Sequence, residues 1–394
     1  MKTIYWLAVG AFAVGTEAFM ISAILPGISK DLDVSLQSVG ALVAIFSFSY
    51  AVSSPVLTAL TAAVDRRRLL IGSMMAFAAT NVFAAMATSY YALAVARVLL
   101  AFSAGLYVPS ANALASVLAP PAQRGRALAI VTGGISAAVA LGVPLGSFIG
   151  EHFGWRATFA GVALLSTVAL AGLLVGLPRG VGSGLSIATL HERLSVVRQP
   201  GALSALLTTT LWATGAYTVY TYISPYLGHV LKLTGTSVGY VLFLYGAAAF
   251  VGLLSGGAAS DRFGARRVIV AELSVMAAAL ASLSAWAGYL SPVQALVPVL
   301  ISIVIWGFTA WGFFPAQQSR LLDLVGLKVA PIILSLNASF MYLGFALGAT
   351  AGSITLSSGG VSDLGAVAAT FVLAALGLFI SRNTSRCTVP LQIS

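Results

Sequence analysis

The sequence predicts an all-α integral membrane protein with twelve transmembrane helices arranged as two parallel six-helix halves. Of its 394 residues, 59% are hydrophobic and only 8% are charged, and the mean hydropathy is +1.00. Soluble domains carry about 25% charged residues, and one soluble core cannot hide this much apolar surface. This composition excludes a soluble enzyme, a nucleic-acid-binding protein and a disordered scaffold, although the net charge is +10. The three histidines are far apart and give no metal cluster or catalytic triad.

The twelve spans are read from apolar runs of the length that a bilayer requires, which is about 20 residues per helix. The first run is longer than the apolar core of a signal peptide, so we expect an uncleaved span. The expected spans are 5–27, 37–60, 69–88, 90–118, 127–150, 157–177, 202–225, 237–259, 268–288, 292–316, 330–355 and 364–381.

The distribution of Lys and Arg orients these spans. With the N-terminus in the cytoplasm, Lys30, Arg156 and Lys232 fall outside and Arg97 lies within the membrane, whereas the other sixteen basic residues fall on the cytoplasmic side. Loop Asp and Glu show no such bias, as the positive-inside rule requires. We therefore expect a multi-pass protein of the cytoplasmic (inner) membrane with both termini in the cytoplasm.

The chain repeats itself at about half its length. An Asp-Arg pair closes the second and the eighth span, a Ser-Val-Gly triplet opens the same two spans, and three glycines spaced by four recur in spans five and eleven. The matching residues are Asp65-Arg66 and Asp261-Arg262, Ser38 to Gly40 and Ser237 to Gly239, and Gly142, Gly146, Gly150 and Gly344, Gly348, Gly352. Six spans per repeat give parallel halves. We expect the N-terminal half over 1–177, a cytoplasmic linker with a short interfacial helix over 178–200, and the C-terminal half with a short cytoplasmic tail over 201–394.

A loop after the eighth span carries the clearest motif. Residues 256–267 read Gly-Gly-Ala-Ala-Ser-Asp-Arg-Phe-Gly-Ala-Arg-Arg and resemble the signature loop of the major facilitator superfamily. The resemblance covers the whole chain and implies the major facilitator fold, a monomer, and a cytoplasmic latch that holds the outward-open state. The alternative is that these arginines only orient the chain. The first-half copy lacks the glycines, so the latch is expected to be lopsided. The latch residues are Asp65, Arg66, Gly256, Asp261, Arg262, Gly264, Arg266 and Arg267.

Two charged residues fall inside the predicted spans at matching depths. Counted at 1.5 Å per residue, Glu17 lies about 15 Å and Arg97 about 12 Å below the outer ends of their helices. A charge in hydrocarbon needs a partner or a cavity, so we expect the two to pair. Burial penalises the carboxylate and a nearby arginine favours it; the balance would let Glu17 load and release a proton. A static packing pair and direct recognition of a cationic substrate are the alternatives, and Glu272 is a weaker candidate for a second proton site.

Span five carries Gly142, Pro144, Gly146 and Gly150, a pattern that resembles the antiporter motif of drug and sugar exporters, with Val143 between its usual Gly-Pro pair. Glycine at every fourth position gives a flat packing face and proline adds a kink. Close helix packing alone is the simpler interpretation. The resemblance points to the drug:proton antiporter, or sugar and drug efflux permease, branch.

Aromatic and amide residues in the spans are candidates for a substrate cavity, because aromatic rings hold flat or cationic organic molecules by stacking and cation–π contact. Interfacial aromatic belts are the alternative. The candidates are Asn112, Trp212, Tyr217, Tyr220, Tyr245, Trp311, Gln317 and Asn337.

The sequence thus predicts a secondary active transporter and no enzyme. It contains no nucleotide-binding loop, so no cofactor is expected and a proton gradient would supply the energy. The expected function is export of small amphiphilic, drug- or sugar-like molecules in exchange for protons by alternating access, with substrate, protons and lipid as partners. An uptake symporter or facilitator of a small metabolite, and a transport-inactive membrane receptor, are the alternatives.

Overall fold

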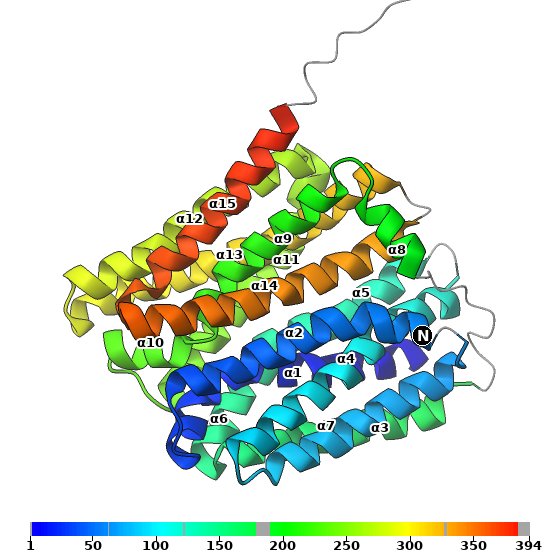
Figure 1. The fold of residues 1–394 in the computed structure, drawn as a ribbon, viewed down its shortest axis with the longest axis horizontal. Coiled ribbons are helices and arrows are strands. Elements are labelled where there is room, and N and C mark those ends of the chain that lie inside the picture. Colours follow the sequence, from blue (N-terminus) through cyan, green and yellow to red (C-terminus); the bar gives the residue numbers. More distant parts are fainter. Residues whose placement is uncertain (1, 62, 121–122, 179–189, 327–328, 385–394) are drawn as a thin grey trace, which may run out of the picture.

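The computed structural model describes residues 2–61, 63–120, 123–178, 190–326 and 329–384, and within these ranges all regular secondary structure is helical. The helices lie side by side in one bundle (Figure 1). The first helix group, as we name α1 to α7, consists of α1 (Lys2–Asp31), α2 (Leu36–Leu60), α3 (Arg66–Ala85), α4 (Tyr90–Leu118), α5 (Arg124–Ala137), the π-helical turn η2 (Ala138–Gly142), α6 (Val143–Phe153) and α7 (Trp155–Gly176).

The second helix group follows the linker and lies on the other side of the bundle in Figure 1. It consists of α9 (Ala202–Tyr220), α10 (Ile223–Val230), α11 (Thr236–Phe263), α12 (Ala265–Tyr289), α13 (Pro292–Val325), α14 (Ala330–Ser358), the 3-10 turn η4 (Val361–Asp363) and α15 (Leu364–Thr384). The linker contributes α8 (Leu190–Val197). Its residues 179–189 lie outside the described ranges, as do Lys328, Arg386 and Arg179 of the charge prediction.

Eleven stretches of described helix are long and apolar enough to cross a membrane, and each coincides with a predicted span. The predicted seventh span, α9, is not among them because it carries five threonines in 19 residues. The helix runs beside α14 and α15, both of spanning length, and most of its residues are buried. Contact with other helices rather than with lipid explains how a less apolar sequence occupies the place of the seventh span.

Two of the predicted helices are interrupted where the sequence reading made them continuous. The 127–150 helix contains the π-turn η2, in which the N–H of Val143 donates to the carbonyl of Ala138. The 202–225 helix ends at Tyr220 and resumes as α10. Both breaks lie just before a proline, Pro144 and Pro225, and a proline cannot donate to the carbonyl four residues back and clashes with it.

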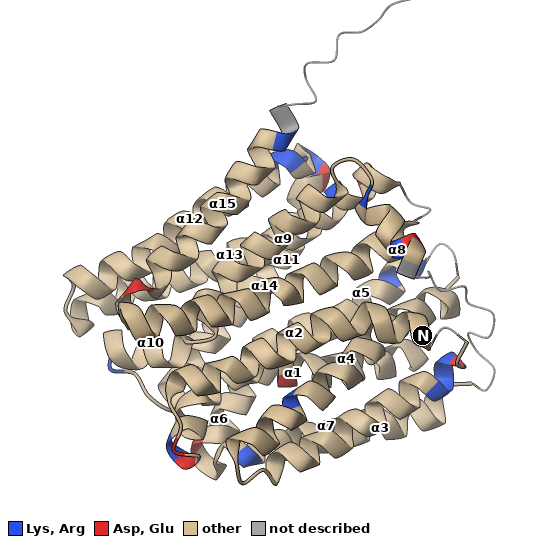
Figure 2. Cartoon of the chain, viewed as in Figure 1, with Lys and Arg blue, Asp and Glu red and all other residues tan. Residues whose placement is uncertain are grey.

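The outer surface of the bundle is apolar, and charges gather at its two ends (Figure 2). Large side chains such as Leu164, Val251 and Ile354 are exposed, which a water-facing surface would not tolerate at this density. Most of the Lys and Arg positions, blue in Figure 2, lie at the end that carries α8 and the N-terminus. The molecule is therefore a multi-pass membrane protein.

The linker helix α8 is anchored on the second helix group. Arg193 is 6% exposed and donates from Nη1 to Ser335 Oγ at 2.5 Å, near the start of α14. Burial lowers the pKa of the Arg193 guanidinium. The linker thus contains a short helix that is tied to α14, and its expected position at the membrane interface stays a prediction.

Candidate functional site

A buried ion pair joins α1 to α4. Arg97 donates from Nη1 to Glu17 Oε1, and both side chains are completely buried. The Nε of Arg97 donates to the carbonyl of Leu42 on α2 at 3.2 Å, and its guanidinium carbon lies 4.2 Å from the centroid of the Phe46 ring. The two charges that the sequence placed at one depth therefore meet, and α2 supports the arginine from the other side.

Each member of this pair keeps one polar atom without a hydrogen-bond partner in the described part of the chain. These atoms are Glu17 Oε2 and Arg97 Nη2. Burying a charged group without hydrogen-bond partners costs free energy, so these two atoms gain by binding a further group. The free carboxylate oxygen can take up a proton, and the free N–H groups can bind a second acceptor.

A glycine face holds the helix of Glu17 against α5, η2 and α6. A Cβ atom on Gly142 would overlap Thr16 Oγ1, one on Gly146 would lie 3.1 Å from the Cβ of Met20, and one on Gly150 would lie 2.6 Å from Ile24 Cγ2. The three contacted residues are themselves spaced by four along α1. This face therefore fixes α1 closely on both sides of Glu17.

The glycine face of α14 repeats this arrangement in the second helix group. Cβ atoms on Gly344, Gly348 and Gly352 would meet the backbone carbonyls of threonines 210, 214 and 218 of α9. The matching glycine triplets of the sequence are thus matching helix-packing faces.

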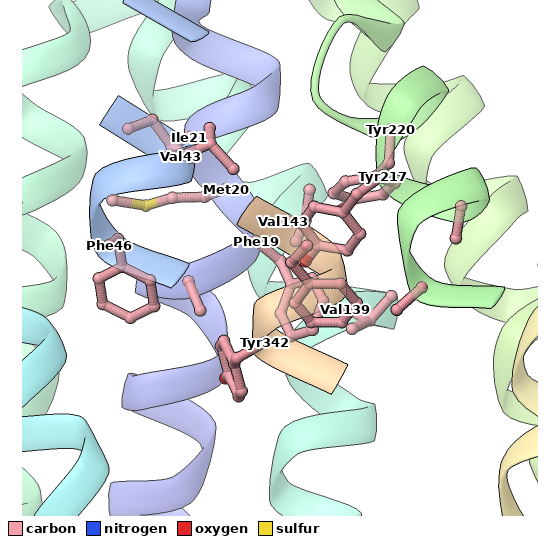
Figure 3. Close-up of a cluster of buried hydrophobic side chains, with 14 of the residues drawn as sticks. Phe19, Met20, Ile21, Val43, Phe46, Val139, Val143, Tyr217, Tyr220 and Tyr342 are labelled. Carbon is pink, nitrogen blue, oxygen red and sulfur yellow. The ribbon is translucent and has the colours of Figure 1, made fainter. Parts of the chain in front are cut away.

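Four of the predicted cavity residues form one aromatic cluster with residues that the sequence reading did not select. Tyr217 and Tyr220 of α9, with Trp311 of α13, lie around the ring of Phe19, and Tyr245 of α11 adjoins Tyr220 at 5.4 Å between ring centroids. Figure 3 shows Phe19 of α1 beside Tyr217, with Tyr220 and Tyr342 nearby.

The remaining predicted cavity residues lie elsewhere. Gln317 and Asn337 are fully buried and both bind Thr209: Gln317 Nε2 donates to Thr209 Oγ1 at 3.0 Å, and Thr209 Oγ1 donates to Asn337 Oδ1 at 2.7 Å. Trp212 stacks on Phe313 at 4.8 Å. Asn112 is only partly buried. The eight candidates therefore do not line one site.

The second-half copy of the latch loop joins α11 to α12 at one end of the bundle. Asp261, Arg262, Arg266 and Arg267 are exposed, and Asp261 makes no ion pair within the described residues. Gly256 lies against the backbone of Gly312 on α13. Gly264 has φ +84°, a conformation that favours glycine at the turn between α11 and α12.

The first-half copy of this loop is built differently. Asp65 accepts a hydrogen bond from the backbone N–H of Arg68 at 3.0 Å and so caps α3. Arg66 is 2% exposed. Arg67 donates from Nε to the carbonyl of Leu177 at 2.9 Å, at the end of α7. The polar groups of Asp65 and Arg67 thus serve to cap α3 and to bind the end of α7.

At the end of the bundle opposite to the latch loops, the two helix groups are in contact. Thr236 Oγ1, at the start of α11, donates to Glu151 Oε2 of α6. The ring of Tyr222 lies against Gly40 of α2, where a Cβ atom would overlap it, and Tyr222 Oη donates to the carbonyl of Ala349 at 3.1 Å. This end of the bundle is closed.

Several residues at the site were missed by sequence reading. Phe46 touches Arg97, and Tyr342 stacks on Tyr50 of α2 at 3.8 Å between centroids. Phe345 stacks on Tyr217 at 3.6 Å. No signal in the sequence separates these aromatic residues from those that face lipid. Among the described residues, no three His, Cys, Asp or Glu side chains gather as metal ligands would.

Comparison with known proteins gives consistent results. Residues 7–349 match the model of the Major Facilitator Superfamily. The chain is 32% identical to the uncharacterized MFS-type transporter YbcL of Bacillus subtilis (strain 168), over 95% of this chain and 93% of that protein. It is also 32% identical to the inner membrane transport protein YdhP of Escherichia coli (strain K12), over 90% and 88%.

Two further similarities concern function and fold. The chain is 33% identical to a chloramphenicol resistance protein of Streptomyces lividans, over 68% of this chain and 69% of that protein. Its fold is similar to the crystal structure of a bacterial homologue of the human lysosomal transporter Spinster in an inward-facing and occupied conformation, with a TM-score of 0.77 and 16% identity over 97% and 96% of the two chains.

Proposed function

The chain belongs to the Major Facilitator Superfamily and is a transporter rather than an enzyme, and we propose that it exports small amphiphilic molecules in exchange for protons by alternating access. The observation that carries this proposal is the ion pair of Glu17 and Arg97. The Glu17 carboxylate is completely buried, is paired with Arg97 and keeps one oxygen free, which favours a group that changes its protonation or its partner during the transport cycle.

The ion pair ties α1 to α2 and α4 of the same helix group. Arg97 is held by α2 and α4, whereas Glu17 is on α1, which is fixed by the glycine face of η2 and α6. A proton on Glu17 would remove the charge that Arg97 binds and would weaken the tie between α1 and α4. Proton binding would thereby change helix packing, which is the requirement for coupling.

The direction and the substrate class rest on the relatives and the motifs. A resistance protein for an antibiotic is among the relatives, and the glycine and proline pattern of α6 resembles that of exporters. Chloramphenicol is therefore the first compound to test, and drug- or sugar-like amphiphiles follow.

The state of the bundle supports alternating access. The ends that carry Glu151 and Thr236 are closed, whereas the charged residues of the second-half latch loop are exposed at the other end, and Asp261 is without an ion pair among the described residues. A latch that holds the outward-open state would be released in a conformation that faces the cytoplasm. We assign this conformation to the protein, as a monomer in the cytoplasmic membrane with both termini in the cytoplasm.

The test uses proteoliposomes that contain a pH-sensitive dye. Addition of chloramphenicol should move protons in the wild type and should move none in Glu17→Gln. Glu272→Gln is the matched control, because Glu272 is a second buried carboxylate, 9% exposed, without an ion pair in the described structure. It should keep wild-type proton movement. Chloramphenicol flux without proton movement in the wild type would refute antiport and leave a facilitator.

A further inference from the structure

Four aromatic residues surround the ring of Phe19 in the interior of the bundle. We call Tyr217, Tyr220, Trp311 and Phe345 the aromatic box. Their ring centroids lie 6.3, 6.1, 6.3 and 6.3 Å from that of Phe19, with interplanar angles of 58°, 88°, 49° and 69°. These distances and tilted or edge-on geometries are the ones that aromatic pairs prefer. The space enclosed by the box is therefore shaped for one aromatic ring.

The box belongs to one helix group and its occupant to the other. Tyr217 and Phe345 stack at 3.6 Å and 17°, and the ring centroids of Tyr217 and Tyr220 lie 5.3 Å apart, so three members of the box, on α9 and α14, contact one another without help from α1. Phe19 enters from α1 of the first helix group, as Figure 3 shows. Binding sites of transporters of this kind lie where the two repeats meet.

A buried polar atom in the box has no partner. Tyr220 is 2% exposed and its Oη has no hydrogen bond among the described residues. Its ring faces Phe19 edge-on. A buried hydroxyl is normally satisfied, so an unsatisfied one beside a ring-shaped space indicates a ligand with a hydrogen-bonding group next to its ring.

Building on the export function proposed above, we propose that Phe19 occupies the substrate's place: an aromatic ring of the transported molecule displaces Phe19 from the aromatic box, and a polar group of the same molecule binds Tyr220 Oη. The substrate class is then a small molecule with one exposed aromatic ring and a neighbouring hydroxyl or carbonyl group. Because Phe19 already makes the ring contacts, the empty transporter keeps its site filled, and a molecule without an aromatic ring gains little by entering.

The proposal makes opposite predictions for Phe19 and for the box. If Phe19 competes with the substrate, its removal strengthens substrate binding, whereas removal of a box residue weakens it. If Phe19 were an ordinary wall of the site, both changes would weaken binding. The sign of the change in affinity thus separates a competing side chain from a lining one.

The experiment measures binding of radiolabelled chloramphenicol, which carries one aromatic ring and hydroxyl groups, to purified full-length protein by equilibrium dialysis. Phe19→Ala should bind at least fivefold more tightly than the wild type, and Phe19→Leu about twofold more tightly, because leucine fills the space without ring contacts. Tyr217→Leu and Tyr220→Phe should weaken binding at least fivefold and about threefold. Phe48→Ala is the matched control, since Phe48 is a phenylalanine of α2 that is 56% exposed on the outer surface; it should change nothing.

A competition series tests the ring itself. Benzyl alcohol should displace chloramphenicol from Phe19→Ala at a concentration at least fivefold lower than cyclohexylmethanol, which has the same number of non-hydrogen atoms and the same hydroxyl group but no aromatic ring. Equal or weaker binding by both Phe19 variants, equal competition by the two alcohols, or no chloramphenicol binding in any form would overturn the proposal. These measurements involve neither flux nor protons. Antiport can therefore fail in proteoliposomes while the box is confirmed, and the reverse outcome is equally recognisable.

Discussion

Arg97 of α4 and Glu17 of α1 bind each other at a depth where neither side chain touches solvent. Removing one member of such a pair leaves a buried charge, whereas replacing both members by apolar side chains is often neutral. The two single losses are not equivalent, because a carboxyl group can be neutralised by a proton and a guanidinium cannot.

We therefore expect Glu17→Leu to lower the free energy of unfolding by about 3–5 kcal/mol, since it strands Arg97. Arg97→Met should cost less, because Glu17 can take up a proton. The double variant should be more stable than Glu17→Leu. Denaturant unfolding of the purified protein in detergent measures all three, and strictly additive losses would show that the two side chains do not act as a pair.

The glycine face of η2 and α6 gives a second prediction. A methyl group on Gly142 would overlap Thr16 Oγ1, whereas a methyl group on Gly133 of the neighbouring α5 would meet nothing within 4 Å. Gly142→Ala should lower stability by about 1–3 kcal/mol through overpacking, and Thr16→Ala in the same chain should recover part of the loss. Gly133→Ala should be neutral or stabilising, since alanine favours helix. Thermal unfolding compares the four proteins, and equal effects at both glycines would contradict the packing role.

The sequence predicted the helices well and their interruptions poorly, for a physical reason. Apolar runs and basic loops report whether a segment crosses the membrane, because lipid imposes length and hydropathy on every span. They do not report local breaks. Pro144 and Pro225 are visible in the sequence. Only the structure shows that a π-helical turn precedes Pro144 and that α9 ends before Pro225.

The ion pair could be predicted, whereas the aromatic box could not. Glu17 and Arg97 are rare in hydrocarbon, so their depths alone suggested that they meet. Phe19 and Phe345 are apolar residues in apolar helices, and nothing in their spacing tells which face lipid and which face the other helix group. The predicted cavity residues Gln317 and Asn337 form a separate hydrogen-bond network around Thr209. Their spacing in the sequence likewise does not tell which neighbouring helix each of them faces.

The closed end of the bundle gives a third prediction. Gly40 leaves room for Tyr222, so Gly40→Ala should prevent close approach of the two helix groups there. Ser147, which is 5% exposed and lies beside Gly239, can report this opening as Ser147→Cys, with Cys387, the single cysteine of the sequence, replaced by serine. Maleimide labelling of the purified protein should be at least fivefold faster with Gly40→Ala. Gly27→Ala, where a Cβ atom meets nothing, should leave the rate unchanged; equal rates in both variants would show that Tyr222 does not depend on Gly40 for closure.

The charge distribution predicts how the bundle lies in the membrane. Most Lys and Arg positions are at one end of the bundle (Figure 2), and loops rich in Lys and Arg stay in the cytoplasm. A phosphatase reporter joined after Leu32, at the end of α1, should be active outside the cytoplasmic membrane. The same reporter joined after Ser394 should be inactive. The opposite pattern of reporter activity would show that the bundle has the inverted orientation in the membrane, and the proposed direction of transport would then be reversed.

The last prediction concerns Asp261, the acidic residue of the second-half latch loop. Asp261 is exposed and makes no ion pair in the part of the chain described here, so Asp261→Asn should change the free energy of unfolding by less than about 0.5 kcal/mol. If Asp261 instead holds the other end-state of the cycle, the same substitution should slow chloramphenicol efflux from proteoliposomes at least fivefold. Asp323, near the end of α13, is also an exposed acidic residue, and Asp323→Asn should alter neither quantity. Full transport by Asp261→Asn would mean that the arginines of this loop serve only to orient the chain in the membrane. A loss of stability would mean that Asp261 already stabilises the conformation seen here.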